Sequence, residues 1–182
     1  MITASNIRIF INCEKDFFLE KLTDLLGQKN IIVINKKIEF FPTINISYKE
    51  KEISINSSVM MKKFSLPIKI DNLISNIFES INSFYFKNAG IQYFPYSKYI
   101  KDQNSQKKIN LNEIHNIILS NLFLNFDNGL SKEELYFFIW PKDKIYSQNK
   151  LDTHLTNLKN ILSGLENFKK NFKTEKGVVR LN

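Results

Sequence analysis

The 182-residue sequence is poor in cysteine, glycine, proline and arginine, and these shortages exclude several classes of protein. Its single cysteine, Cys13, rules out a disulfide framework and any zinc site built on several thiolates. Five glycines and four prolines are too few for a fibrous chain, and 43% hydrophobic residues are too many for a disordered one. No run of about 18 apolar residues occurs, so we expect no membrane-spanning helix.

Signals of secretion and of catalysis are also missing. The segment Met1 to Phe10 lacks the basic stretch and apolar run of a secretory signal, which predicts a cytoplasmic location. There is no glycine-rich phosphate loop, no metal-ligand cluster and no catalytic-triad spacing, so we expect no enzyme, no catalytic residue, no metal site and no cofactor. The two histidines, His115 and His154, are interpreted as packing or phosphate-adjacent residues.

The charge of the chain is positive and unevenly distributed. The net charge is +8 at pH 7, and lysine supplies nearly all the basic groups because only Arg8 and Arg180 are arginines. Residues 1–83 carry a net charge of +2, and residues 84–182 carry a net charge of +6. We therefore expect an anionic partner to bind the second half, and we place the domain boundary near Ser83.

Periodicity in the first half predicts an α/β layer. Alternating isoleucines over 7–11 indicate a buried strand, and 16–27 follows as a helix with one apolar face. The run 31–34 predicts a second buried strand, parallel to the first because a helix joins the two. Two or three short strands are expected within 36–61, and the apolar spacing over 70–81 predicts a closing helix.

Two capping patterns predict helices in the second half. Asn110 with Glu113 indicates the start of a helix that stops at an Asp-Asn-Gly turn, and Ser131 with Glu134 indicates the start of another. Short helices that meet at a glycine-containing turn are typical of helix-turn-helix proteins. The polar stretch 98–108 is interpreted as a loop within this half.

The helix predicted over Asn149–Leu162 carries the most informative pattern of the chain. Its leucines form one apolar stripe, made of Leu151, Leu155, Leu158 and Leu162. The opposite side carries side chains that hydrogen-bond to base edges and phosphates: Asn149, Thr153, Thr156, Asn157 and Asn160, flanked by Lys150 and Lys159. The chain then ends in a predicted basic hairpin, in which Lys173, Lys176 and Arg180 bracket Gly177.

Four segments of the second half resemble, in order, the winged-helix DNA-binding domain of OmpR/PhoB-type response regulators. Residues 109–118 are similar to the family's LTxxEFxLL start, and residues 129–140 to its GxVxSRxxLxxxVW helix. Residues 152–162 are similar to the recognition pattern VDxHIxxLRxKL, and residues 174–177 to the wing TVRGxGY. The wing departs from that pattern at 178–180, where the second glycine and the tyrosine are missing.

The first half resembles the receiver domain that precedes such a module, in a shortened form. The first strand ends in Asn12 and Cys13, where the family holds magnesium with paired carboxylates. No aspartate lies between Asp24 and Asp71 to accept a phosphoryl group, and Leu66 replaces the expected lysine. The resemblance implies dimerisation through this domain. The missing carboxylates and lysine indicate regulation without phosphorylation, so we predict no phosphorylation site.

The sequence thus predicts an α/β receiver-like N-terminal domain, residues 1–83, followed by an α+β winged helix-turn-helix C-terminal domain, residues 84–182. Such a bacterial regulator would bind double-stranded DNA in the nucleoid as a homodimer, without a membrane contact. The expected DNA-binding residues are Asn149, Lys150, Thr153, Thr156, Asn157, Lys159, Asn160, Lys173, Lys176 and Arg180. The alternative is a winged-helix module that has lost DNA binding and contacts a protein such as RNA polymerase through 141–148.

Overall fold

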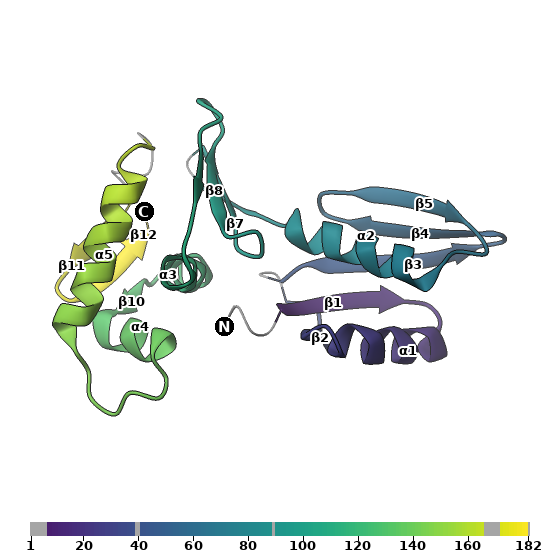
Figure 1. Ribbon diagram of the computed structural model, residues 1–182, viewed down its shortest axis with the longest axis horizontal. Helices are drawn as coiled ribbons and strands as arrows, with labels where there is room; N and C mark the ends of the chain where they lie inside the picture. Colours follow the sequence, from purple (N-terminus) through teal and green to yellow (C-terminus); the bar gives the residue numbers. More distant parts are fainter. Residues whose placement is uncertain (1–6, 39–40, 89, 166–171, 182) are drawn as a thin grey trace. The chain divides into compact units, whose positions relative to one another are not determined.

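The computed structural model describes residues 7–38, 41–88, 90–165 and 172–181. The chain divides into two compact units between Phe84 and Tyr85, one residue beyond the boundary placed at Ser83. The N-terminal unit contains a five-stranded sheet, and the C-terminal unit contains a four-stranded and a three-stranded sheet (Figure 1). Within the described ranges, no helix is both long enough and apolar enough to cross a membrane.

The N-terminal unit begins with a strand, a helix and a parallel strand, as predicted. Its elements are β1 (Ile7–Cys13), α1 (Asp16–Gly27), β2 (Ile31–Ile34), β3 (Thr43–Lys49), β4 (Glu52–Ser57), β5 (Met61–Ser65) and α2 (Ile70–Asn82). The strand order is β2-β1-β3-β4-β5. β1 runs parallel to both β2 and β3, whereas β3, β4 and β5 form an antiparallel meander. The prediction of two or three strands within 36–61 is therefore confirmed.

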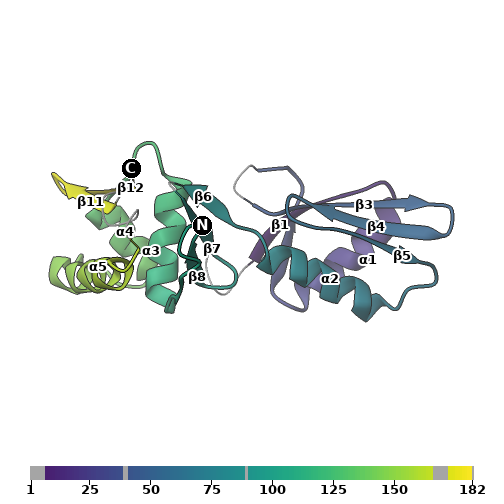
Figure 2. The same cartoon turned by 90° about the horizontal axis from the view of Figure 1, so that it is seen from above.

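Among the described residues of the N-terminal unit, helices cover one face of this sheet. Alternate strand residues are buried, and they lie on the same face: Ile9, Ile11, Ile44, Ile46, Ile53 and Ile55. Both helices pack on that face through the buried side chains Leu22, Leu26, Leu73 and Ile77 (Figures 1 and 2). On β3 and β4 the other face carries polar side chains, and Ser47 and Ser54 are joined across it by a hydrogen bond of 2.7 Å. The antiparallel connections β3–β4 and β4–β5 contain no helix, which explains why no second helical layer forms.

The prediction that 31–34 is a buried strand is only partly right. Ile31 is buried, but Ile32 is 41% exposed. β2 is an edge strand that pairs only with β1, and alternate residues of an edge strand on a one-sided sheet face solvent. The run of isoleucines therefore indicated strand propensity correctly and burial incorrectly.

Aromatic packing occupies the carboxyl end of β1 and β3. The Tyr48 ring meets the Phe18 ring edge to face at 5.3 Å between centroids, and the Lys15 ammonium lies 4.9 Å from the Tyr48 centroid. Burial, with a smaller effect of Cys13, raises the pKa of Tyr48 to about 12. The edge where the resemblance places magnesium-binding carboxylates thus carries an aromatic pair and a lysine. Among the described residues, no cluster of three His, Cys, Asp or Glu side chains is arranged to hold a metal.

The C-terminal unit is built around one central helix. Its elements are β6 (Phe86–Asn88), β7 (Ile91–Phe94), β8 (Tyr99–Asp102), β9 (Lys108–Asn110), α3 (Glu113–Leu124), β10 (Leu130–Ser131), α4 (Lys132–Ile139), α5 (Gln148–Leu162), β11 (Phe172–Glu175) and β12 (Val178–Leu181). α3 lies between the four-stranded sheet and the other two helices (Figure 1). The last strands pair antiparallel in the order β10-β12-β11.

The interpretation of 98–108 as a loop is wrong. Ile100 of β8 pairs with Ile109 of β9, and the turn between the strands is held by Asp102, whose carboxylate accepts two backbone N–H groups at 2.8 Å. These hydrogen bonds lower the pKa of Asp102. The strands were missed because they are short: β8 has four residues and β9 has three, so alternation of apolar and polar residues is hard to recognise among the many lysines and amides.

The start of α3 also differs from its prediction. The N-cap is Asn112, whose side chain accepts the His115 N–H at 2.8 Å, whereas Asn110 ends β9. Eight of the twelve residues of α3 are buried, and four of these eight are polar. On the face toward the four-stranded sheet, the Tyr93 hydroxyl donates to the Asn116 side-chain oxygen at 2.7 Å. The centre of this unit therefore combines apolar packing with buried hydrogen bonds.

Candidate nucleic-acid interface

The turn before α4 ties that helix to the C-terminal hairpin. Gly129 has a φ of +69°, and a Cβ added there would lie 2.7 Å from the Val179 carbonyl oxygen. Glycine is therefore needed for β10 to approach β12, where Leu130 pairs with Val179. The Lys132 N–H then donates to the Gly177 carbonyl at 2.9 Å, which fixes the first turn of α4 against the hairpin.

The predicted capping box at the start of α4 is confirmed. The Glu134 N–H donates to the Ser131 hydroxyl oxygen at 3.2 Å, and the Ser131 N–H donates to the Glu134 carboxylate at 2.9 Å. The Ser131 side chain and backbone, in that order, lower the pKa of Glu134 by hydrogen bonding to its charged form. The register of α4 is thus set locally by two residues.

α5 presents the leucine stripe to the core and a polar face to solvent. Its four leucines are each 3% exposed or less. The residues predicted to contact DNA lie on the exposed side: Asn149, Thr153, Thr156, Asn157 and Asn160. Five of the residues on or beside this side line a shallow depression of about 420 Å³: Asn149, Asp152, Thr153, Thr156 and Asn157. One helix face therefore brings together hydrogen-bonding groups that are uncharged except for one carboxylate.

Lys150 is directed toward the connection between α4 and α5. Its ammonium lies 3.0 Å from an Asp143 carboxylate oxygen and 4.0 Å from the centroid of the Trp140 ring. The Tyr136 hydroxyl donates to the same oxygen at 2.5 Å. Tyr136 and then Lys150 lower the pKa of Asp143 through these hydrogen bonds. Lys150 consequently lies at the margin of the polar face and is engaged within the protein.

Lys159 is directed toward the hairpin at the other end of α5. Its ammonium lies 3.5 Å from the Thr174 hydroxyl and 5.3 Å from the centroid of the Phe172 ring. It therefore joins α5 to β11 and adds a positive charge between the helix and the hairpin.

Asp152 is the acid at the margin of the polar face, and its charge is compensated. The Lys132 ammonium lies 2.5 Å from one carboxylate oxygen, and the Gln148 amide donates to the other at 3.3 Å. Sequence reasoning missed the role of Lys132, because twenty positions separate it from Asp152 and no local pattern links them. The ion pair leaves this face without an uncompensated negative charge.

The basic side chains of the β11–β12 hairpin are exposed to solvent. Lys173 pairs directly with Arg180 across the strands, and Lys176 stands in the two-residue turn with a φ of +49°. All three are exposed, and in the described part of the chain none forms an ion pair. Like charges placed directly opposite each other on a sheet repel. An anion bound at this hairpin would relieve that repulsion.

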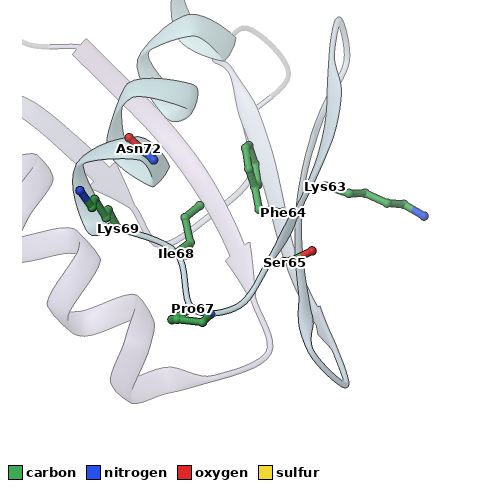
Figure 3. A pocket seen from close by; sticks show the side chains of 7 residues that line it. All are labelled: Lys63, Phe64, Ser65, Pro67, Ile68, Lys69 and Asn72. Carbon is green, nitrogen blue, oxygen red and sulfur yellow. The ribbon is translucent and has the colours of Figure 1, made fainter.

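A second depression, of about 620 Å³, lies in the N-terminal unit beside β5 and the start of α2. Figure 3 shows that Lys63 and Ser65 point away from Pro67 and Ile68. The lining residues of β5 alternate between the two faces of the sheet, so their polar groups do not converge. This depression is not a candidate site.

Distant neighbours of this chain are found among the solved structures, and two of them are described here. No family model matches the chain, and no curated protein matches it. The structure of a RitR mutant is 13% identical, covers 97% of this chain and 99% of its own, and gives a TM-score of 0.44. A structure described as a novel family of redox sensors in the streptococci, evolved from two-component response regulators, is 17% identical, covers 98% of this chain and 68% of its own, and also gives 0.44. At this level of similarity, neither neighbour assigns an activity to this chain.

Proposed function

We propose that the C-terminal unit is a winged helix-turn-helix domain of the OmpR/PhoB type and that the chain is a DNA-binding transcriptional regulator. α5 would lie in the major groove, and the β11–β12 hairpin would contact the adjacent phosphates. The observation that carries this proposal is the exposed face of α5, where amide and hydroxyl groups lie between cationic groups at both ends.

Two further observations support contact with a polyanion. The acid beside the polar face, Asp152, is paired with Lys132, so it would not repel phosphates strongly. Lys173 and Arg180 oppose each other on the hairpin without an ion pair among the described residues. Phosphate binding would stabilise both charges and release condensed counterions from the duplex.

For the N-terminal unit, we propose a receiver-like domain that works without phosphorylation and mediates dimerisation. The parallel part of the sheet, in the order β2-β1-β3, is arranged as in flavodoxin-like doubly wound sheets, whereas β4 and β5 depart from that fold because they run antiparallel. The aromatic pair Phe18 and Tyr48, with Lys15, lies at the strand ends where phosphorylation chemistry would need carboxylates. A dimer would carry two α5 helices and so require two half-sites in the DNA.

The proposal is tested by recovering genomic DNA crosslinked to the tagged full chain. We expect discrete peaks that disappear when Lys159, Lys173 and Lys176 are all changed to Ala. A matched variant with three exposed lysines of the N-terminal unit changed, Lys29, Lys37 and Lys51, should keep the peaks. If the wild type enriches no DNA, or if the first variant recovers the same DNA, the proposal fails.

A specific observation favours a second candidate function, contact with a protein. Ile145, in the connection between α4 and α5, is 82% exposed. An apolar side chain this exposed on a projecting connection fits a partner such as RNA polymerase. If Ile145 contacts RNA polymerase, the chain should capture the purified polymerase and the variant Ile145→Asp should not. DNA binding by the same variant, measured in parallel, distinguishes a module with both contacts from one that has lost DNA binding.

A further inference from the structure

The polar face of α5 combines asparagine and threonine, and among the described residues no cation is directed across it. We infer that this face reads A·T base pairs in the major groove, an inference that rests on the proposed function. An asparagine amide matches the N6 donor and N7 acceptor of adenine, and a threonine methyl packs on the thymine methyl. Guanine is read instead by arginine or lysine, whose donors match its O6 and N7 acceptors.

The side chains of α5 that could read G·C pairs are directed toward other parts of the protein. Lys150 is held by Asp143 and the Trp140 ring, and Lys159 is directed to Thr174 on β11. α5 contains no arginine. An aspartate can accept a hydrogen bond from cytosine N4, but Asp152 lies at the margin of the face, where its carboxylate is held by Lys132 and Gln148.

Three residues of the face are placed to contact successive base pairs. Thr153, Asn157 and Asn160 stand at i, i+4 and i+7, so they lie on one side of the helix and span about 10 Å along it. With base pairs spaced about 3.4 Å apart, this length covers about three of them.

Thr153 and Asn157 differ in their hydrogen bonds, so we assign them different contacts with the bases. The Thr153 hydroxyl donates to the Asn149 carbonyl at 2.8 Å, so its proton is used inside the helix and its methyl group remains for thymine. In the described part of the chain, the Asn157 amide forms no hydrogen bond and lies on the exposed side. Its donor and acceptor are therefore both open to adenine.

The experiment starts with selection of duplexes from a randomised pool by the full chain at about physiological salt. We expect an A·T-rich core. Each adenine of the selected site is then replaced by 7-deazaadenine, which lacks the N7 acceptor and still pairs with thymine. At one position this should weaken wild-type binding about 5- to 100-fold, and it should have no effect on Asn157→Ala. In parallel, uracil in place of thymine should weaken the wild type and leave Thr153→Ser unchanged.

The variants lie on the exposed side of α5, opposite the leucine stripe, so the core is left intact. Asn72→Ala, on the exposed side of α2, is the matched control and should retain the sensitivity to 7-deazaadenine. A selected site that depends on G·C pairs and on guanine N7, with Asn157→Ala unaffected, overturns the inference while DNA binding stands. If no duplex is bound above the level of random DNA, the inference and the proposed function fall together.

Discussion

The exposed charges of the hairpin allow the proposed DNA binding to be separated from folding. Changing Lys173 and Arg180 to Gln removes two like charges that face each other across β11 and β12. Changing Lys176 to Asn removes the third charge at a φ of +49°, a conformation that asparagine adopts more readily than lysine. All three changes are therefore expected to keep the hairpin folded, and relief of the cross-strand repulsion is worth about 0.2–1 kcal/mol.

The expected loss of affinity follows from the number of phosphate contacts. If each of the three side chains neutralises one phosphate, the slope of log K against log salt falls by about 2.7 per protomer. Over a fourfold change in salt, from about 50 to about 200 mM, this slope amounts to a factor of about 40 in affinity. The triple variant should thus lose affinity at low salt and respond much less to added salt.

The assay is fluorescence anisotropy of a labelled duplex at several salt concentrations, with thermal unfolding of the same proteins measured alongside. The control variant carries Lys29→Gln, Lys37→Gln and Lys51→Gln, which change the net charge equally. The control should keep the wild-type slope. Coinciding slopes for the wild type and the hairpin variant, with unfolding temperatures unchanged, would refute the assignment of phosphate contacts to the hairpin.

Three further predictions concern the C-terminal core. Leu158→Ala removes a fully buried side chain of α5 and should lower the free energy of unfolding in urea by about 2–5 kcal/mol. Tyr93→Phe leaves the buried Ser120 hydroxyl without its partner at 2.6 Å, and the same assay should show a loss of about 1–3 kcal/mol. Burial, and then His154, lower the pKa of His115, so the folded state holds this ring neutral. The unfolded state therefore binds the proton first, and wild-type stability should fall as pH drops below about 6.5, whereas His115→Gln should show a weaker fall over the same range.

Elements with local periodicity could be predicted from the sequence, because local contacts decide them. The leucine stripe of α5 and the capping box of Ser131 with Glu134 depend on residues three to eleven positions apart, and both are confirmed. The exposed side of α5 follows from the stripe by geometry alone. The exposed polar face of α5 could therefore be predicted before any tertiary contact was known.

Features that depend on distant partners could not be predicted in this way. The sequence predicted Asn110 as the N-cap of α3, but Asn112 is the N-cap, because pairing of Ile109 with Ile100 holds Asn110 in β9. The directions of Lys150 and Lys159 likewise depend on rings and hydroxyls supplied by other elements. These directions decide which charges lie beside the exposed face of α5, so the chemistry of that face could not be predicted from the sequence.

The electrostatics of the α5 face depend on the turn that begins α4. Gly129 lets β10 pair with β12, and the Ser131 capping box then fixes where α4 starts. Lys132, the first residue of that helix, is placed by this register within 2.5 Å of Asp152 on α5. If α4 started one residue later, helical geometry would rotate this position by about 100° and separate the pair. Asp152 would then oppose phosphates beside the face proposed to meet DNA, so a glycine twenty-three positions away helps to set the charge of that face.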